Sequence, residues 1–290
     1  MPGESHFIPG MVRDRRRYES PSGFQGEVFL RVLGRHPRFR RWRLSEDTVR
    51  RSFFDDPPST LAAAFRRVYA LFAEDRRKTR YGDKTPAYIH HIPAIVGLFP
   101  EARFVHLVRD GRGVALSRLD HPTMSASLSD LAMLWKRGVD KGRRMGRRLG
   151  LHRYREIRYQ DLVRDPEEVT RSLCAFIELG FDPVMLSYHQ RANEIVRPTQ
   201  HPESHARIHL PPTGGLRDRK TQMAPADIEL FDMLAGGLLE ELGYERGSRR
   251  RSIGHRLVAR RRKLGLGTGR VAHAVTKRVI PWRRRVAERD

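Results

Sequence analysis

The sequence predicts an α/β fold built on a parallel sheet, for three reasons. Residues 103–108 form a short apolar run rich in β-branched and aromatic side chains, as in a strand buried within a parallel sheet. Residues 154–158 form a second candidate strand. The segments before, between and after these runs carry apolar residues at helical spacing, and strands that alternate with helices are typical of parallel sheets.

The first part of the chain is predicted to be mostly helical. One helix is expected over residues 24–33, with Gly34 at its end and an apolar face made of Phe24, Val28 and Val32. Residues 35–43 are a basic cluster that contains Phe39 and Trp42. Aromatic and arginine side chains together can bind single-stranded nucleic acid. The favoured interpretation is a surface segment that its two aromatic rings anchor to the core.

Further helices follow in order. One begins at residues 57–60 and carries a stripe typical of core packing: Leu61, Phe65, Val68, Tyr69 and Phe72. Another is expected over residues 87–99, where Pro93 kinks or breaks it. After the first strand, helices are expected over 127–148, 166–178, 184–191 and 225–242, and Gly243 stops the last of them.

Composition limits the class of protein. The 290 residues, 39% of them hydrophobic, allow one large domain with a core. The single cysteine, Cys174, excludes an intramolecular disulfide, and its apolar helical surroundings predict a packed core thiol. The sequence shows no run of 18 apolar residues and no secretory signal, so a cytoplasmic protein is expected.

The net charge of +23 is concentrated near the C-terminus. Residues 246–290 contain sixteen Lys and Arg residues and two acids, a net charge of +14. This predicts a domain over residues 1–245 and a basic tail over residues 246–290, partly helical or disordered. Apolar residues lie among the arginines of the tail, so peripheral contact with an anionic membrane is expected rather than contact with nucleic acid.

Residues 80–117 carry the strongest functional signal. Arg109 stands where the first strand ends, and Asp-Gly-Arg-Gly then opens a helix that carries Ser117 about two turns later. A strand end beside a helix N-terminus favours anions, because free N–H groups and the helix dipole attract negative charge. The pattern therefore predicts a phosphate-binding strand, turn and helix. The alternative is a surface arginine with an ion-pair partner and a solvent-facing serine.

The longer pattern resembles a known family. It comprises Phe-Val-His-Leu-Val-Arg-Asp-Gly-Arg-x-Val-Ala-x-Ser at residues 104–117, an earlier Gly-Asp-Lys-Thr-Pro and a later Tyr-x-Asp-Leu-Val. It is similar to the sulfotransferases that use 3′-phosphoadenylyl sulfate (PAPS), especially their bacterial and tyrosylprotein-type branch. The resemblance implies a three-layer, P-loop-NTPase-like α/β fold with a central parallel sheet flanked by helices. It also implies that Arg109 and Ser117 bind the 3′-phosphate of the donor.

The same resemblance implies two catalytic residues. Lys84 would reach the sulfonate and the bridging oxygen of the donor, where negative charge develops. Cytosolic members use a histidine base at a position that is Pro86 here. In the tyrosylprotein-type branch the base is a glutamate, which falls on Glu4, and His6 could contact acceptor or donor. The alternatives are a surface lysine paired with its neighbouring aspartate and a frayed N-terminus.

Three more residues are candidates for donor binding. Tyr159 matches a tyrosine that contacts the adenine, although a half-buried core tyrosine is the alternative. Arg217 and Lys220 lie in a Gly-Gly-Leu-Arg-Asp-Arg-Lys-Thr stretch that matches a region closing over the donor, where Arg219 replaces the family's tryptophan. The histidines lack cysteine or carboxylate partners at ligand spacing, so no metal is expected.

The family's most specific feature is a Gly-x-x-Arg-Ser-Gly-Thr-Thr-like loop after an N-terminal strand. Nothing similar occurs in this sequence, so the first strand and the loop for the donor's 5′-phosphosulfate are expected to be missing. Either the true start lies upstream of Met1, which is favoured, or the chain is a degenerate homologue. An incomplete sheet would expose an edge and lower solubility.

The expected function is therefore transfer of a sulfuryl group from PAPS to a hydroxyl of a carbohydrate, lipid or small molecule. The expected partners are the nucleotide donor, a hydroxylated acceptor and an anionic membrane. Two alternatives stay open: a catalytically inactive homologue, and a basic protein that binds nucleic acid or membrane.

Overall fold

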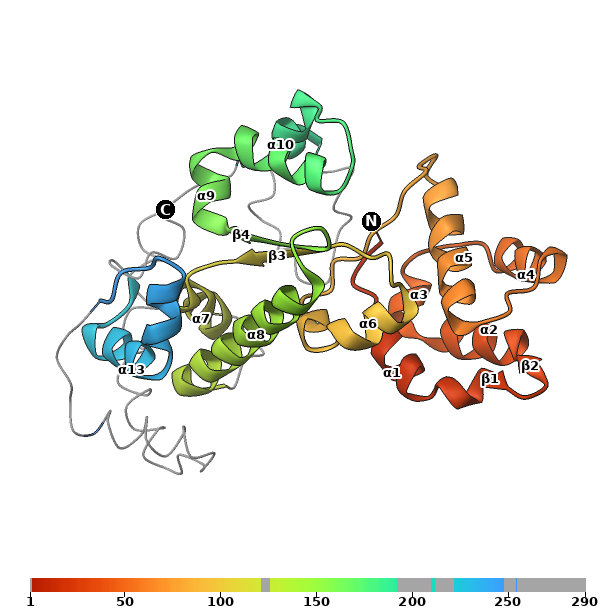
Figure 1. The fold of residues 1–290 in the computed structure, drawn as a ribbon, viewed down its shortest axis with the longest axis horizontal. Coiled ribbons are helices and arrows are strands. Elements are labelled where there is room, and N and C mark those ends of the chain that lie inside the picture. The colour runs from red at the N-terminus through yellow and green to blue at the C-terminus, as the bar shows by residue number, and fades with distance from the viewer. Residues whose placement is uncertain (1, 121–125, 192–209, 212–221, 248–253, 255–290) are drawn as a thin grey trace. The chain divides into compact units, whose positions relative to one another are not determined.

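The computed structural model describes residues 2–120, 126–191, 210–211, 222–247 and 254 (Figure 1). The chain divides into two compact units. The N-terminal unit comprises Met1–Arg103 and Arg144–Leu149, and the C-terminal unit comprises Phe104–Arg143 and Gly150–Asp290.

The N-terminal unit is helical apart from a short antiparallel pair, β1 (Glu19–Ser20) with β2 (Gly23–Phe24). Its helices are α1 (Ile8–Arg13), α2 (Gly26–Arg35), α3 (Pro37–Arg40), α4 (Glu46–Asp55), α5 (Leu61–Glu74) and α6 (Ile92–Leu98), with 3₁₀ helices η1 (Arg15–Arg17) and η2 (Pro86–His90).

Helix α5 is the centre of this unit. The Thr60 side chain accepts a hydrogen bond from the Ala63 backbone at 3.1 Å and so caps the helix where the sequence predicts its start. All five residues of the predicted apolar stripe are buried. The ring of Trp42, which is 1% exposed, packs edge-on against Tyr69 and Phe72. The basic cluster is thus anchored to the core as predicted, and its Phe39 is half-buried.

Helix α2 differs from the prediction at both ends and in its buried face, since it begins at Gly26 and Phe24 lies in β2. It runs one residue past Gly34, and its buried side chains are Phe29, Leu30 and Leu33, whereas Val28 and Val32 are only half-buried. The Phe29 ring stacks on Phe53 at 5.7 Å and meets Phe65 edge-on at 5.3 Å. These aromatic contacts from distant helices determine which face of α2 is buried, and local spacing does not show them.

The helix predicted over residues 87–99 is two helices. The chain breaks at His91, which lies between η2 and α6. Pro93 falls in the first turn of α6, where a missing N–H leaves no helical hydrogen bond unmade. The proline therefore starts the second helix.

The C-terminal unit contains the predicted parallel strands, β3 (Phe104–Val108) and β4 (Tyr154–Arg158). Its helices are α7 (Gly111–Leu119), α8 (Leu128–Leu149, whose last turns group with the N-terminal unit), α9 (Tyr159–Arg164), α10 (Pro166–Phe176) and α13 (Pro225–Glu241), with the 3₁₀ segment η3 (Pro183–Arg191). The two strands run between α9 and α10 on one side and α7 and α8 on the other (Figure 1).

The register of this pair determines what lies at its edge. Phe104 pairs with Tyr154, and Val108 pairs with Arg158. Both strands therefore end at the same edge of the sheet. The residues that follow them, Arg109 and Tyr159, lie at that edge. Within the described residues β3 pairs only with β4, and its Val105 and Leu107 are 47% and 50% exposed.

The end of α13 returns the chain toward this edge. Gly243, with φ of +75°, donates to the Glu240 carbonyl at 2.9 Å, and Tyr244 donates to the Leu239 carbonyl at 2.8 Å. This is a Schellman motif, which requires a left-handed residue that glycine adopts without strain. Gly243 therefore stops the helix as predicted. Cys174 is buried, as expected of a core thiol.

Candidate functional site

Two of the predicted donor-binding residues meet at the ends of the parallel strands. Arg109 follows β3, Tyr159 follows β4, and the guanidinium carbon of Arg109 lies 4.9 Å from the centroid of the Tyr159 ring. Both side chains are half-buried. A cation over an aromatic ring is an attractive pair. The parallel register thus places the guanidinium of Arg109 beside the aromatic ring of Tyr159. A guanidinium can bind a phosphate, and an aromatic ring can stack on a nucleotide base.

Helix α7 begins at this edge. The Asp110 side chain caps it by accepting a hydrogen bond from the Arg112 backbone N–H at 2.9 Å. The Trp135 indole N–H donates to the Arg109 carbonyl at 3.1 Å, which fixes the turn from the other side. Ser117 is exposed on the same helix. The predicted strand, turn and helix are therefore present, with the expected residues on them.

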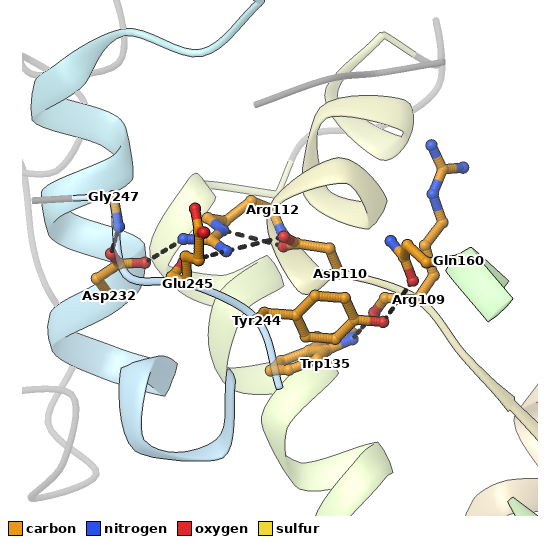
Figure 2. A network of polar contacts seen from close by, with 9 residues as sticks. All are labelled: Arg109, Asp110, Arg112, Trp135, Gln160, Asp232, Tyr244, Glu245 and Gly247. Atoms are coloured by element: carbon orange, nitrogen blue, oxygen red, sulfur yellow. Dashed lines mark hydrogen bonds and ion pairs between the residues drawn. The ribbon is translucent and has the colours of Figure 1, made fainter. Parts of the chain in front are cut away.

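The turn also contains a buried charge to which the sequence analysis gave no role. Arg112 is fully buried, and its guanidinium contacts two carboxylates (Figure 2). Its Nη2 donates to Asp110 at 2.8 Å and to the Glu245 carbonyl at 2.9 Å, and its Nη1 donates to Asp232 at 3.1 Å. The other Asp232 oxygen accepts from the Gly247 N–H at 2.7 Å. We call Asp110, Arg112, Asp232 and Glu245 the arginine clamp.

The segment after α13 makes a second link to the edge. The Tyr244 hydroxyl donates to the side-chain oxygen of Gln160 at 2.6 Å (Figure 2), and the Arg158 guanidinium lies over the Tyr244 ring at 5.1 Å. Burial raises the pKa of Tyr244 to about 12, so its hydroxyl stays protonated and can donate. The residues on either side of Tyr159 are thus held by contacts to Tyr244, in the segment that follows α13.

The two predicted catalytic residues meet in the N-terminal unit. Lys84 Nζ donates to Glu4 Oε1 at 2.5 Å, and His6 Nε2 lies 3.0 Å from Glu4 Oε2. The side chain of Glu4 is 30% exposed and that of Lys84 is 64% exposed. One carboxylate, one ammonium and one imidazole therefore share a solvent-accessible cluster, although Glu4 and Lys84 are 80 residues apart in the sequence.

A buried polar network beneath this cluster fixes both segments. The Ser5 backbone N–H donates to Thr85 Oγ1 at 3.0 Å, and the Ser5 hydroxyl bonds to the Tyr88 hydroxyl. Asp83 accepts from the Thr85 hydroxyl at 2.6 Å and from the Tyr69 hydroxyl at 2.5 Å. Ser5 is completely buried, so the N-terminal segment is packed rather than frayed. Asp83 therefore accepts hydrogen bonds from the Tyr69 and Thr85 hydroxyls, whereas Lys84 donates to Glu4.

The surroundings of Glu4 favour its ionised form. Burial by itself would raise the pKa of Glu4, but hydrogen bonds and charge from Lys84 and His6 together outweigh it and lower the pKa below its ordinary value. Glu4 is therefore a carboxylate at neutral pH, able to accept a proton.

Two of the predicted donor-binding residues, Arg217 and Lys220, lie outside the described residues. In the part of the chain that the structure describes, no group of three or more metal-ligating side chains comes together. Nor does that part contain a helix with the length and apolarity needed to span a membrane.

A family model described as "Sulfotransferase family" matches residues 2–183, a range that includes Glu4, Lys84, Arg109, Ser117 and Tyr159. Omega-hydroxy-beta-dihydromenaquinone-9 sulfotransferase Stf3 of Mycobacterium bovis is 31% identical over 121 residues, 36% of this chain and 30% of that protein. Protein-tyrosine sulfotransferase of Drosophila melanogaster is 24% identical over 120 residues, 40% of this chain and 24% of that protein. Each match thus spans less than a third of the relative's length.

Two solved structures are similar over most of the chain. The sulfotransferase domain from the curacin biosynthetic pathway has a TM-score of 0.55 at 18% identity, covering 84% of this chain and 88% of its own. The sulfotransferase domain from the Synechococcus PCC 7002 olefin synthase has a TM-score of 0.54 at 24% identity, covering 84% and 85%. These likenesses concern the fold, and they confirm the P-loop-NTPase-like α/β class predicted from the sequence.

Proposed function

Because the chain belongs to the sulfotransferase family, we propose that it transfers a sulfuryl group from PAPS to the hydroxyl of a carbohydrate, lipid or small molecule. Two relatives support a hydroxyl acceptor, since one is named for an omega-hydroxylated menaquinone and the other for protein tyrosine. The acceptor class stays this broad because folds host many substrates.

The observation that carries the proposal is the pairing of Arg109 with Tyr159 at the shared strand edge. In the proposed complex Arg109 and Ser117 bind the 3′-phosphate of the donor, and the Tyr159 ring contacts the adenine. The positive end of the α7 dipole adds to the attraction for the phosphate. Arg217 and Lys220 are proposed as further contacts of the donor phosphates.

The chemistry proposed for the N-terminal cluster is an in-line transfer. The acceptor oxygen attacks sulfur, the bond from sulfur to the phosphate oxygen breaks, and 3′-phosphoadenosine 5′-phosphate leaves. Lys84 stabilises the negative charge that develops on the leaving phosphate, which is the largest kind of catalytic contribution in such sites. Glu4 takes the proton of the acceptor hydroxyl, a role for which its carboxylate is ionised at neutral pH.

Calorimetry with the reaction product tests the donor site directly. The chain should bind 3′-phosphoadenosine 5′-phosphate at least about tenfold more tightly than adenosine 5′-phosphate, because charge-assisted hydrogen bonds to the 3′-phosphate are lost with the latter. Arg109→Ala should remove this preference. Arg118→Ala is the matched control, an exposed arginine next to Ser117 on α7. Equal binding of the two nucleotides, or unchanged binding by Arg109→Ala, would contradict the donor assignment.

The basic tail suggests where in the cell this activity takes place. Residues 246–290 carry a net charge of +14, with apolar residues among the arginines. We propose that the enzyme works in the cytoplasm and that the tail brings it to an anionic membrane surface. An inactive homologue that only binds such a surface is the alternative, and it predicts no turnover of PAPS with any hydroxyl probe.

A further inference from the structure

The backbone of His6 has an unusual conformation. Its φ is +58°, in the left-handed region that only a few per cent of residues other than glycine adopt, with asparagine, aspartate and histidine the most frequent among them. A conformation of this kind persists only where the surrounding structure imposes it, and such residues are concentrated at functional sites.

The surroundings of His6 impose it from both sides. Ser5 before it is completely buried and is hydrogen-bonded to Thr85 and Tyr88. Phe7 after it is 3% exposed, and its ring stacks on Phe65 at 6.0 Å. His6 itself is exposed between these two anchors. The fixed neighbours leave the left-handed turn no room to relax.

The consequence of the turn is that the imidazole folds back onto the residue two positions earlier. His6 Nε2 lies 3.0 Å from Glu4 Oε2, while Lys84 contacts the other carboxylate oxygen, Oε1. An ionised carboxylate can only accept hydrogen bonds, so Nε2 of His6 carries the hydrogen in this contact. Glu4 is thus held by a separate donor on each oxygen.

We propose that His6 is a positioning residue that orients Glu4, the base of the proposed sulfuryl transfer, by donating a hydrogen bond to its Oε2. This inference rests on the proposed function. Lys84 has a second task in that function, on the leaving phosphate, and a lysine engaged there no longer restrains Glu4. The His6 contact then holds the carboxylate with Oε1 directed to the acceptor hydroxyl.

Two substitutions distinguish the effect of the imidazole on turnover from the effect of the strained backbone on stability. His6→Gly removes the side chain and adopts φ of +58° without strain, so its urea midpoint should equal or exceed that of the unchanged protein. Its kcat should fall about 10- to 100-fold because the base is no longer oriented. His6→Gln, whose amide can donate a similar hydrogen bond, should restore most of the kcat. His152→Gln is the control, an exposed histidine of the C-terminal unit.

The pH dependence gives a readout that a purely structural role would not move. His6 is one of the groups that lower the pKa of Glu4, so its loss should raise that pKa. The acid limb of kcat should therefore shift to higher pH in His6→Gly, with affinity for 3′-phosphoadenosine 5′-phosphate unchanged. The turnover probes are PAPS with 2-naphthol and PAPS with a prenyl alcohol.

Failure of this inference is distinguishable from failure of the proposed function. If Glu4→Gln keeps full turnover, Glu4 is not the base and the proposed chemistry is wrong. If Glu4→Gln is inactive but His6→Gly keeps the normal kcat and acid limb, only the role of His6 is overturned. Carbon-13 NMR of labelled glutamate carboxyls, assigned with Glu4→Gln, gives a test independent of turnover: an unchanged Glu4 midpoint in His6→Gly also overturns it.

Discussion

Gly111 shows, at the scale of one residue, how tightly the turn between β3 and α7 is packed. It is the first residue of α7, directly after the Asp110 cap. A Cβ atom at this position would lie 2.7 Å from atoms of both Trp135 and Phe231, closer than real contacts allow. Any side chain would therefore displace two large rings of the core, one of which also bonds to the Arg109 carbonyl. Close approach, rather than backbone conformation, requires glycine here.

Gly111→Ala should lower the free energy of unfolding by about 1–3 kcal/mol, the usual cost of overpacking a core. Urea unfolding midpoints measure the change. Gly237→Ala is the matched control, because Gly237 lies on the exposed face of α13 with no atom within 4 Å of the added methyl. That substitution should raise the free energy of unfolding by about 0.5–1 kcal/mol, since alanine is the better helix former. If Gly111→Ala and Gly237→Ala changed the free energy of unfolding in the same direction, close packing around Gly111 would not be the cause.

The arginine clamp operates at the scale of elements. Arg112 on α7 joins the Asp110 cap, Asp232 on α13 and the Glu245 carbonyl beyond α13. Its guanidinium is fully buried, and the side chains of Asp110 and Asp232 are 15% and 5% exposed. A buried charge costs free energy when unpaired, so all the members depend on one another. The strand edge with Arg109 is thereby tied to the last described helix.

Arg112→Met should destabilise the chain by about 3–5 kcal/mol, because it removes the guanidinium whose charge balances the carboxylates of Asp110 and Asp232 in the interior. Adding Asp232→Leu should recover part of this loss, since the second change removes one uncompensated charge. Chemical unfolding of the two single variants and the double variant measures the coupling. If the double variant is the sum of the singles, the clamp does not act as a unit.

A surface pair supplies the control for this cycle. Arg164 and Asp161 are 2.9 Å apart on α9, but the Arg164 side chain is 76% exposed. Arg164→Met should change the free energy of unfolding by less than about 1 kcal/mol, because exposed ion pairs contribute little. The contrast tests burial of the charge as the cause.

At the scale of the whole molecule, contacts of Arg246 and Gly247 decide where the predicted basic tail can be removed without disturbing the described residues. Arg246 pairs with Glu240 at 2.7 Å, and the Gly247 N–H bonds to Asp232 at 2.7 Å. The Gly247 N–H thus supports the Asp232 carboxylate of the arginine clamp, and a deletion from residue 246 would remove that contact. A clean test of the tail begins at residue 248.

Deleting residues 248–290 removes fifteen Lys and Arg residues and two acids. The shortened chain should bind 3′-phosphoadenosine 5′-phosphate as well as the full chain does, because Arg109, Ser117 and Tyr159 are retained. It should lose sedimentation with phosphatidylglycerol vesicles, which the full chain should show at low salt. Neutral phosphatidylcholine vesicles are the control. Vesicle binding that survives the deletion would exclude the tail as the anchor.

Much of the architecture was predictable because it depends on local pattern. The two strands and the stripe of α5 follow from apolar periodicity, and the helix start at Thr60 and the helix stop at Gly243 follow from capping chemistry. Helix α4 was missed although Ser45 caps it, with its hydroxyl accepting from Thr48, because its sequence is mostly polar. The buried face of α2 was assigned to the wrong residues, since rings on α4 and α5 determine it.

The sequence by itself determined the family, the strand ends and the residue types at them. Only the tertiary structure decided which of those residues meet. Parallel register sets Arg109 beside Tyr159, and buried hydroxyl contacts bring Glu4 to Lys84 across 80 residues. The arginine clamp and the strained turn at His6 are also features that only the tertiary structure decided. Each depends on contacts between segments far apart in the chain, and a local pattern of residues carries no record of such contacts.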